Sequence, residues 1–321
     1  MIWPVMKLTK ALVVVALGVA VACGGNFPET VVIGTGPTGG VYYPYGEALA
    51  HIMTDEIQGT QFSAIATDAS VDNLKMMHEG KLDLALTLAD SLAAAHAGTG
   101  PFASTGKVDV HSVATLYTNY THVIVRKDSG ITSLAELAGR RVSTGAVGSG
   151  TEIVADRLLL AAGIDPQTGI MRHPLGLASS VEALKGGTID AIFLSGGAPT
   201  PAIKELAAAI EITMLPTGTL QPALQQRFGP HLYRVHDMLA GTYVGMTSDV
   251  PVVGVPNLLV ASGRLSPAFV AKLTQTLFDA NETLAILLPE VRALAWPANP
   301  TVAPTPFHPG ALQYYEANVW R

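Results

Sequence analysis

Two glycine-rich segments of the chain have residue types that could bind a small anion. Residues 34–46 follow the apolar run 31–33, and residues 145–152 follow a short predicted strand over 141–143. Each segment precedes a stretch with helical spacing of apolar residues. Glycine and proline exclude regular structure in the first segment. The N-terminus of a helix presents free backbone N–H groups and the positive end of the helix dipole. A strand, a glycine loop and a helix start therefore predict an anion site in each segment.

The first segment has three interpretations. Gly34, Gly36 and Gly39 match the Gly-x-Gly-x-x-Gly pattern of dinucleotide-binding proteins. Against that function, residues 42–44 (Tyr-Tyr-Pro) would break the helix, and no acid stands about 20 residues on at a second strand end. The second interpretation is a tight structural turn. We favour the third, a cradle for a small anion, in which tyrosine supplies an apolar face and one hydroxyl.

The second segment adds hydroxyl groups to its glycines. Ser149 and Thr151 flank Gly150 at the predicted helix start, and Glu152 follows in the first turn. The alternative is an ordinary capped helix. We favour binding, because hydroxyl and N–H groups occur together and the same arrangement recurs in both segments.

Other polar residues are weaker candidates, and none indicates catalysis. Asp90 and residues 195–196 follow two strands at matching places, so they are expected to face a common cleft. Arg172 could pair with a ligand carboxylate or be a solvated surface residue. The histidines lack metal-ligand spacing, and no Gly-x-Ser-x-Gly pattern is present. The sequence predicts binding, with no turnover, metal or cofactor.

The composition is typical of a compact globular protein. Charged residues make up 14% of the chain, hydrophobic residues 49%, and the net charge is −6. A weakly acidic chain argues against nucleic-acid binding, which needs a basic face. It also means that an anion site must be built locally.

The N-terminal residues resemble an export signal. Lys7 and Lys10 precede an apolar run over residues 11–22, which is too short to span a bilayer. Residues 20–23 (Ala-Val-Ala-Cys) resemble a bacterial lipobox, in which the cysteine becomes the lipidated N-terminus, although Ala20 stands where Leu is usual. Cys23 is the only cysteine, so an internal disulfide is excluded; the alternative is a stray thiol. We expect residues 1–22 to be a signal peptide and the mature chain to be extracytoplasmic and membrane-anchored.

Two parts of the chain share one plan. Predicted strands over residues 31–33, 62–66 and 82–86 alternate with helices that end near residues 57 and 80. Strands over 141–143, 169–173 and 189–193 alternate in the same way with helices that end near 162 and 186. Ser70 and Ser180 stand at the expected N-caps of matching helices. Alternating strands and helices predict parallel sheets with helices on both faces.

Twin α/β units predict two lobes with a ligand cleft between them. We expect residues 23–118 to form the first part of lobe 1 and residues 119–241 to form lobe 2. Residues 242–321 would return to lobe 1, with helices over 267–277 and 281–288. The β-rich residues 117–125, and residues 242–246 with the segment after them, would be the crossing strands.

A series of motifs resembles the TAXI-type solute-binding proteins of TRAP transporters. Residues 33–44 are similar to the opening signature of that family, and residues 306–316 to its closing one. Weaker matches lie between them in the same order, over residues 70–74, 145–152, 190–200 and 249–259. The chain departs from the family pattern at Asp68 and Ala69, where Glu-Gly is usual, and at residues 88–89, where Gln often precedes the aspartate that Asp90 matches.

The resemblance implies a two-lobe periplasmic-binding-protein fold of type II that closes on a small carboxylate similar to glutamate, glutamine or 2-oxoglutarate. A TRAP permease driven by an ion gradient would then import it. The alternatives are a receptor for an ATP-driven importer or a sensor, and an exported hydrolase or transferase. Position by position, the residues implied to contact ligand are Thr35, Gly36, Gly39, Tyr42, Ser70, Asp90, Tyr117, Ser149, Gly150, Thr151, Ser195 and Gly196.

Overall fold

A computed structural model of the protein describes residues 27–288 and 304–318. The expected signal peptide over residues 1–22 and the expected lipid attachment at Cys23 lie outside the described residues. Within the described part of the chain, none of the helices has the length and apolar composition needed to cross a bilayer.

The first α/β unit has three parallel strands, of which the most buried joins the unit to the rest of the sheet. In order, its elements are β1 (Thr30–Gly34), α1 (Tyr42–Glu56), β2 (Gln61–Ile65), α2 (Ser70–His78), β3 (Leu84–Leu88) and α3 (Ala89–Ala97). All five residues of β3 are buried, as expected for a strand with helices on both sides. The strands pair in parallel in the order β2-β1-β3.

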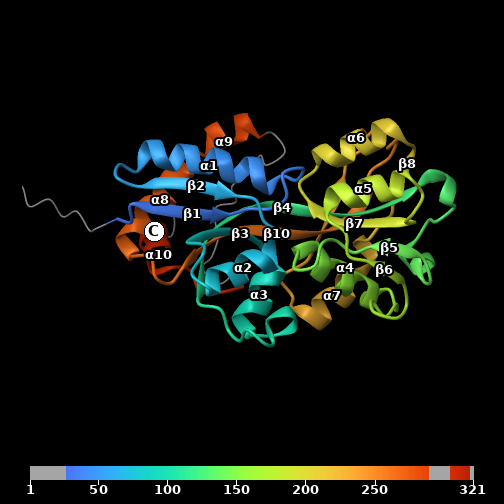
Figure 1. The fold of residues 1–321 in the computed structure, drawn as a ribbon, viewed down its shortest axis with the longest axis horizontal. Coiled ribbons are helices and arrows are strands. Elements are labelled where there is room, and N and C mark those ends of the chain that lie inside the picture. The colour runs from blue at the N-terminus through green and yellow to red at the C-terminus, as the bar shows by residue number, and fades with distance from the viewer. Residues whose placement is uncertain (1–26, 289–303, 319–321) are drawn as a thin grey trace, which may run out of the picture.

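The second unit repeats this topology. It comprises β5 (Arg141–Ser143), α4 (Gly150–Ala161), β6 (Met171–His173), α5 (Leu177–Lys185), β7 (Ala191–Gly196) and α6 (Pro201–Ala209). The order β6-β5-β7 matches β2-β1-β3, and these pairs are also parallel. The predicted repeat of α/β elements is therefore present, and helices cover both faces of each half of the sheet (Figure 1).

Two long antiparallel strands join the units into one ten-stranded sheet. They are β4 (Val110–Arg126) and β10 (Val250–Ser262), which lie side by side along the middle of the molecule (Figure 1). Beyond their common pairing, β10 pairs with β3 and with β9 (Arg234–Met238), and β4 pairs with β7 and β8 (Ile212–Met214). The expected crossing strands over residues 117–125 and after residue 246 are confirmed as parts of β4 and β10, whereas residues 242–246 themselves form a turn before β10.

The remaining helices complete the packing of the two halves. They are α7 (Gln221–Phe228), α8 (Pro267–Asp279), α9 (Asn281–Leu287) and α10 (Pro309–Asn318). The Ser266 Oγ accepts a hydrogen bond from the Phe269 N–H and Pro267 is the first helical residue, so α8 has a favourable N-terminus. The apolar core beside α3 and α4 is continuous from one unit to the other.

Three helix starts differ from the sequence prediction. The helix α1 begins at Tyr42, because Pro44 falls in the first turn, where a missing N–H costs nothing. Ser70 is the first residue of α2 rather than its N-cap, and Ala69 holds the cap position. Ser180 lies inside α5, which begins earlier, at Leu177.

Candidate ligand-binding site

A cavity lies where five helix N-termini meet between the two α/β units. The first residues of α1, α2, α4 and α5, and Thr200 before α6, all line it. Its volume is about 90 Å³, counted as the space open to the centre of a water molecule. One water needs roughly 10–15 Å³ on that measure. The cavity therefore has room for a small solute of several heavy atoms.

Seven of the twelve predicted contact residues line this cavity, and four of the seven come from the two glycine segments. The seven are Tyr42, Ser70, Ser149, Gly150, Thr151, Ser195 and Gly196. The two segments, which lie about a third of the chain apart, are thus brought together as the repeat predicts. The glycine segments predict the helix starts of α1 and α4 at the site, the contact predicted for Ser70 adds that of α2, and the structure adds those of α5 and α6.

The N-terminus of α4 has two backbone donors to offer. The Ser149 Oγ accepts a hydrogen bond from the Glu152 N–H (3.1 Å), and the Glu152 Oε2 accepts one from the Gly148 N–H (2.9 Å). Among the described residues, no hydrogen bond uses the N–H of Gly150 or Thr151. Ser149 is therefore a helix cap as well as a lining residue.

Gly150 permits the close approach of the two units. A Cβ atom added there would lie 2.6 Å from the Ser70 Oγ and 2.7 Å from the Leu88 Cδ1, so a side chain would push α4 away from α2 and β3. The Asp72 N–H also donates a hydrogen bond to the Gly148 carbonyl across the same contact (3.0 Å). The structure therefore shows the two units closed against each other at the cavity.

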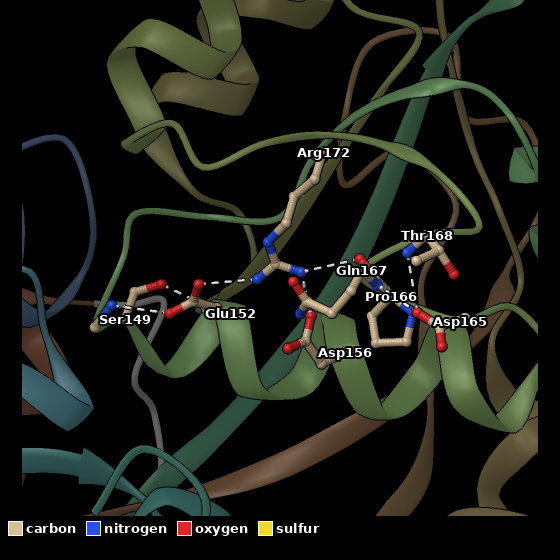
Figure 2. Close-up of polar contacts among 9 residues, drawn as sticks. Ser149, Glu152, Asp156, Asp165, Pro166, Gln167, Thr168 and Arg172 are labelled. Atoms are coloured by element: carbon tan, nitrogen blue, oxygen red, sulfur yellow. Dashed lines mark hydrogen bonds and ion pairs between the residues drawn. The ribbon is translucent and has the colours of Figure 1, made fainter. Parts of the chain in front are cut away.

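Arg172 pairs with carboxylates of the protein itself, and it is not the solvated surface residue of the alternative prediction. Its Nη2 lies 2.8 Å from the Glu152 Oε1 and its Nη1 lies 2.5 Å from the Asp156 Oδ1 (Figure 2). The guanidinium is mostly buried against α4. Its positive charge offsets the acidic groups of the first turns of α4, which would otherwise repel an anion at that helix N-terminus.

Ser195 lines the cavity and has a buried hydroxyl group. Its backbone N–H donates to the Thr151 Oγ1 (3.1 Å). Its own Oγ is buried and has no hydrogen-bond partner among the described residues. Because buried polar groups are nearly always paired, an unpaired hydroxyl in a cavity wall indicates a position for a ligand atom.

Two asparagines that the sequence analysis missed connect the units beneath the cavity. The Tyr42 hydroxyl donates to the Asn257 Oδ1, the Asn257 Nδ2 donates to the Asn119 Oδ1 (2.6 Å), and the Asn119 Nδ2 donates to the Ser195 carbonyl (3.2 Å). Asn119 lies on β4 and also lines the cavity, while Asn257 lies on β10. Burial raises the pKa of Tyr42 well above its usual value, so its hydroxyl remains a neutral donor.

Four further predicted contact residues lie outside the cavity lining, each for a packing reason. The Thr35 Oγ1 donates to the Ile65 carbonyl (2.5 Å), and Tyr117 lies in the core against the Tyr45 ring. Gly36 lies under the Tyr42 side chain: an added Cβ would be 3.1 Å from the Tyr42 Cβ. Gly39 faces α6.

Asp90 also lies away from the cavity, contrary to the prediction. Its carboxylate is fully buried, accepts a hydrogen bond from the Tyr233 hydroxyl (2.9 Å) and lies 3.5 Å from the Arg157 Nη1. Arg157 also donates to the Tyr233 hydroxyl (2.6 Å). Burial raises the pKa of Asp90. The contacts among Asp90, Arg157 and Tyr233 therefore connect α3 with α4 and with the segment before β9.

A buried histidine holds the loop between β7 and α6. The Tyr243 hydroxyl accepts a hydrogen bond from the Thr200 N–H (2.8 Å) and lies 2.8 Å from the His122 Nε2. The His122 Nδ1 lies 3.0 Å from the Tyr120 carbonyl, which can only accept, so the proton of the neutral ring is on Nδ1 and Nε2 accepts from the Tyr243 hydroxyl. Burial lowers the pKa of His122 to about 4, so the ring is neutral. This chain fixes Thr200, which lines the cavity.

The lining has little formal charge. Asp68, which is exposed, is its only carboxylate, and no lysine, arginine or histidine is among the lining residues. Apolar walls come from Val41, Leu177 and Phe193, among others. An anion in this cavity would be held by N–H and hydroxyl groups instead of by a cationic side chain.

The architecture is that of two-lobe periplasmic binding proteins, as comparison with solved structures shows. The alkanesulfonate-binding protein SsuA from Xanthomonas axonopodis pv. citri, bound to MOPS, has a TM-score of 0.56 at 17% identity, covering 91% of this chain and 85% of that one. PhnD1 from Prochlorococcus marinus, in complex with methylphosphonate, has a TM-score of 0.54 at 13% identity, covering 83% and 91%. A putative L-cystine ABC transporter from Listeria monocytogenes has a TM-score of 0.51 at 15% identity, covering 83% and 97%.

The family assignment is more specific than the fold. The chain belongs to the NMT1-like family, whose model matches residues 33–317. The match includes both glycine segments and every residue that lines the cavity.

Proposed function

We propose that this protein is the solute-binding receptor of an importer and captures a small organic anion in the cavity between its lobes. The observation that supports this most directly is the meeting of five helix N-termini at one cavity. Each N-terminus contributes about half a positive charge and unpaired N–H groups. Together they make an environment that favours an anion without a cationic side chain.

The bound group is a carboxylate in this proposal. One oxygen would accept hydrogen bonds from the N–H groups of Gly150 and Thr151, and the Ser195 hydroxyl would donate to the same head group. Val41, Leu177 and Phe193 would contact a short carbon chain. Two proteins of similar fold are described with an alkanesulfonate or methylphosphonate ligand, so small sulfonates and phosphonates are the nearest competing anions.

An ATP-driven importer is the partner that we propose. The sequence resemblance suggested a TRAP permease, but a protein of similar fold is described as part of an ABC transporter, and the family matched is NMT1-like. Receptors of this kind act outside the cytoplasm, which agrees with the predicted export signal and the possible lipid anchor at Cys23. Uptake that needs ATP and survives collapse of the ion gradients would support this partner; the reverse pattern would favour the TRAP permease.

Ligand-induced thermal stabilisation tests the proposed function. A ligand that binds only the folded state raises the melting temperature by mass action. We expect a small carboxylate to raise the Tm of the mature chain and to be recovered unchanged after incubation. Stabilisation by neutral sugars alone would contradict the anion site, and conversion of the bound compound would contradict a receptor role.

A further inference from the structure

Ala69 has a backbone conformation that normally requires glycine. Its φ is 75° and its ψ is −143°. It is the one non-glycine residue with positive φ in the described part of the chain, where the other such positions are glycines. A side chain in this region is strained, and such strain persists only where the surroundings impose it.

Hydrogen bonds on both sides impose this conformation. The Ala69 N–H donates to the Thr67 Oγ1 (3.1 Å), and its carbonyl accepts from the Asn73 N–H (2.9 Å). The buried Asn73 side chain in turn donates to the Thr35 and Leu86 carbonyls, at 2.8 Å each, and accepts from the Thr67 hydroxyl (2.7 Å). The turn is therefore fixed to β1 and β3, and it presents the first turn of α2 to the cavity.

The methyl group of Ala69 occupies space in the proposed ligand site. Ala69 lines the cavity directly before Ser70. A Cβ added at Gly36 would lie 3.5 Å from the Ala69 Cβ and 3.1 Å from the Tyr42 Cβ, so the methyl lies over the first glycine loop beside the tyrosine. Glycine at position 69 would have the same backbone without strain and would leave this space open.

We propose that Ala69 is a specificity-determining residue, whose methyl group limits the length of ligand that the cavity accepts at a cost in stability. The proposal rests on the proposed function, since it concerns the same cavity. The methyl also packs against the core that contains Tyr42, so the test must measure stability and ligand preference separately.

The test compares Ala69→Gly with Ala146→Gly. Ala146 also lines the cavity, is also half-buried and has negative φ, so its variant removes one lining methyl without relieving strain. We expect the Tm of Ala69→Gly to rise by about 2–4 °C, and that of Ala146→Gly to fall. The probes are straight-chain carboxylates and alkanesulfonates of increasing length, followed by calorimetry.

In Ala69→Gly, the affinity for the next longer probe relative to the preferred one should rise about fourfold, the value of one additional buried methylene. Ala146→Gly should change this ratio less. A lower Tm in Ala69→Gly than in the wild type would contradict the claim that the Ala69 backbone is strained. An unchanged preference for ligand length would contradict the specificity role. If the wild-type protein binds no probe, the proposed function and the specificity role fail together, while the Tm comparison still decides the strain.

Discussion

The Ser195→Ala variant separates ligand binding from folding. The Ser195 hydroxyl is buried without a hydrogen-bond partner in the described residues, and Ser195 is one of the residues that line the cavity. Its removal therefore breaks no bond in the ligand-free protein. An unpaired buried hydroxyl costs about 1–3 kcal/mol, so the alanine variant should be as stable as the wild type or more stable.

The effect on binding should be much larger. A hydrogen bond to a charged group contributes about 1.5–3 kcal/mol, which corresponds to a roughly 10- to 150-fold increase in Kd. Isothermal titration calorimetry with the most stabilising carboxylate measures this change, and urea unfolding of the ligand-free protein measures stability.

Thr121→Val is the matched control for this variant. Thr121 lies opposite Ser195 in the β4–β7 pairing, and its Oγ1 is also buried without a partner among the described residues. It does not line the cavity, so its isosteric variant should change Kd by less than about twofold. A wild-type Kd in Ser195→Ala, or the same weakening in Thr121→Val, would refute the reasoning.

Three further predictions concern buried charges. Arg157→Met leaves the Asp90 carboxylate buried without its cation, so urea titration should show that the free energy of unfolding falls by about 3–5 kcal/mol. The double variant with Asp90→Asn should recover part of this loss. Wild-type stability of Arg157→Met would contradict the pairing. Arg172→Met leaves the negative charge of Glu152 without its partner near the α4 N-terminus. Calorimetry should then show anion binding weakened about two- to fivefold at low salt and less at high salt. Wild-type affinity of the variant at low salt would exclude a role of Arg172 in anion binding. Burial lowers the pKa of His122 from 6.5 to about 4, so the stability that the neutral ring contributes is present above pH 6.5 and is lost as the pH falls towards 4. The wild-type Tm should therefore fall more steeply between pH 6.5 and 4 than the Tm of His122→Gln, by the equivalent of about 3 kcal/mol. Plots of Tm against pH that run parallel for the two proteins would contradict this role of His122.

Local patterns were sufficient to predict the α/β repeat. The strands β1 and β5 are each followed by a glycine loop and a stretch with the apolar spacing of a helix, which predicts the same strand–loop–helix unit twice. The start of α4 was predicted because Ser149 and Glu152 form a local cap. The start of α5 was not, because tertiary packing draws Leu177 and the residues after it into the helix, and Ser180 then bonds to the Ser143 hydroxyl.

The candidate site was predicted only in part, because side-chain direction depends on tertiary structure. Asp90 does follow a strand, as expected, but α3 begins at once after β3 and turns the carboxylate towards Arg157. Asn119 and Asn257 lie inside long strands, where only a polar residue in an apolar context marks them. Their hydrogen bond joins residues far apart in the chain, which no local pattern indicates.

A crystal structure of the mature chain grown with the most stabilising carboxylate is the most direct test of the central claim. The account predicts electron density for the carboxylate in the cavity, with an oxygen within hydrogen-bond distance of the Gly150 and Thr151 N–H groups and of the Ser195 Oγ. A ligand bound elsewhere, or one in the cavity with its charged end directed away from the α4 N-terminus, would contradict it.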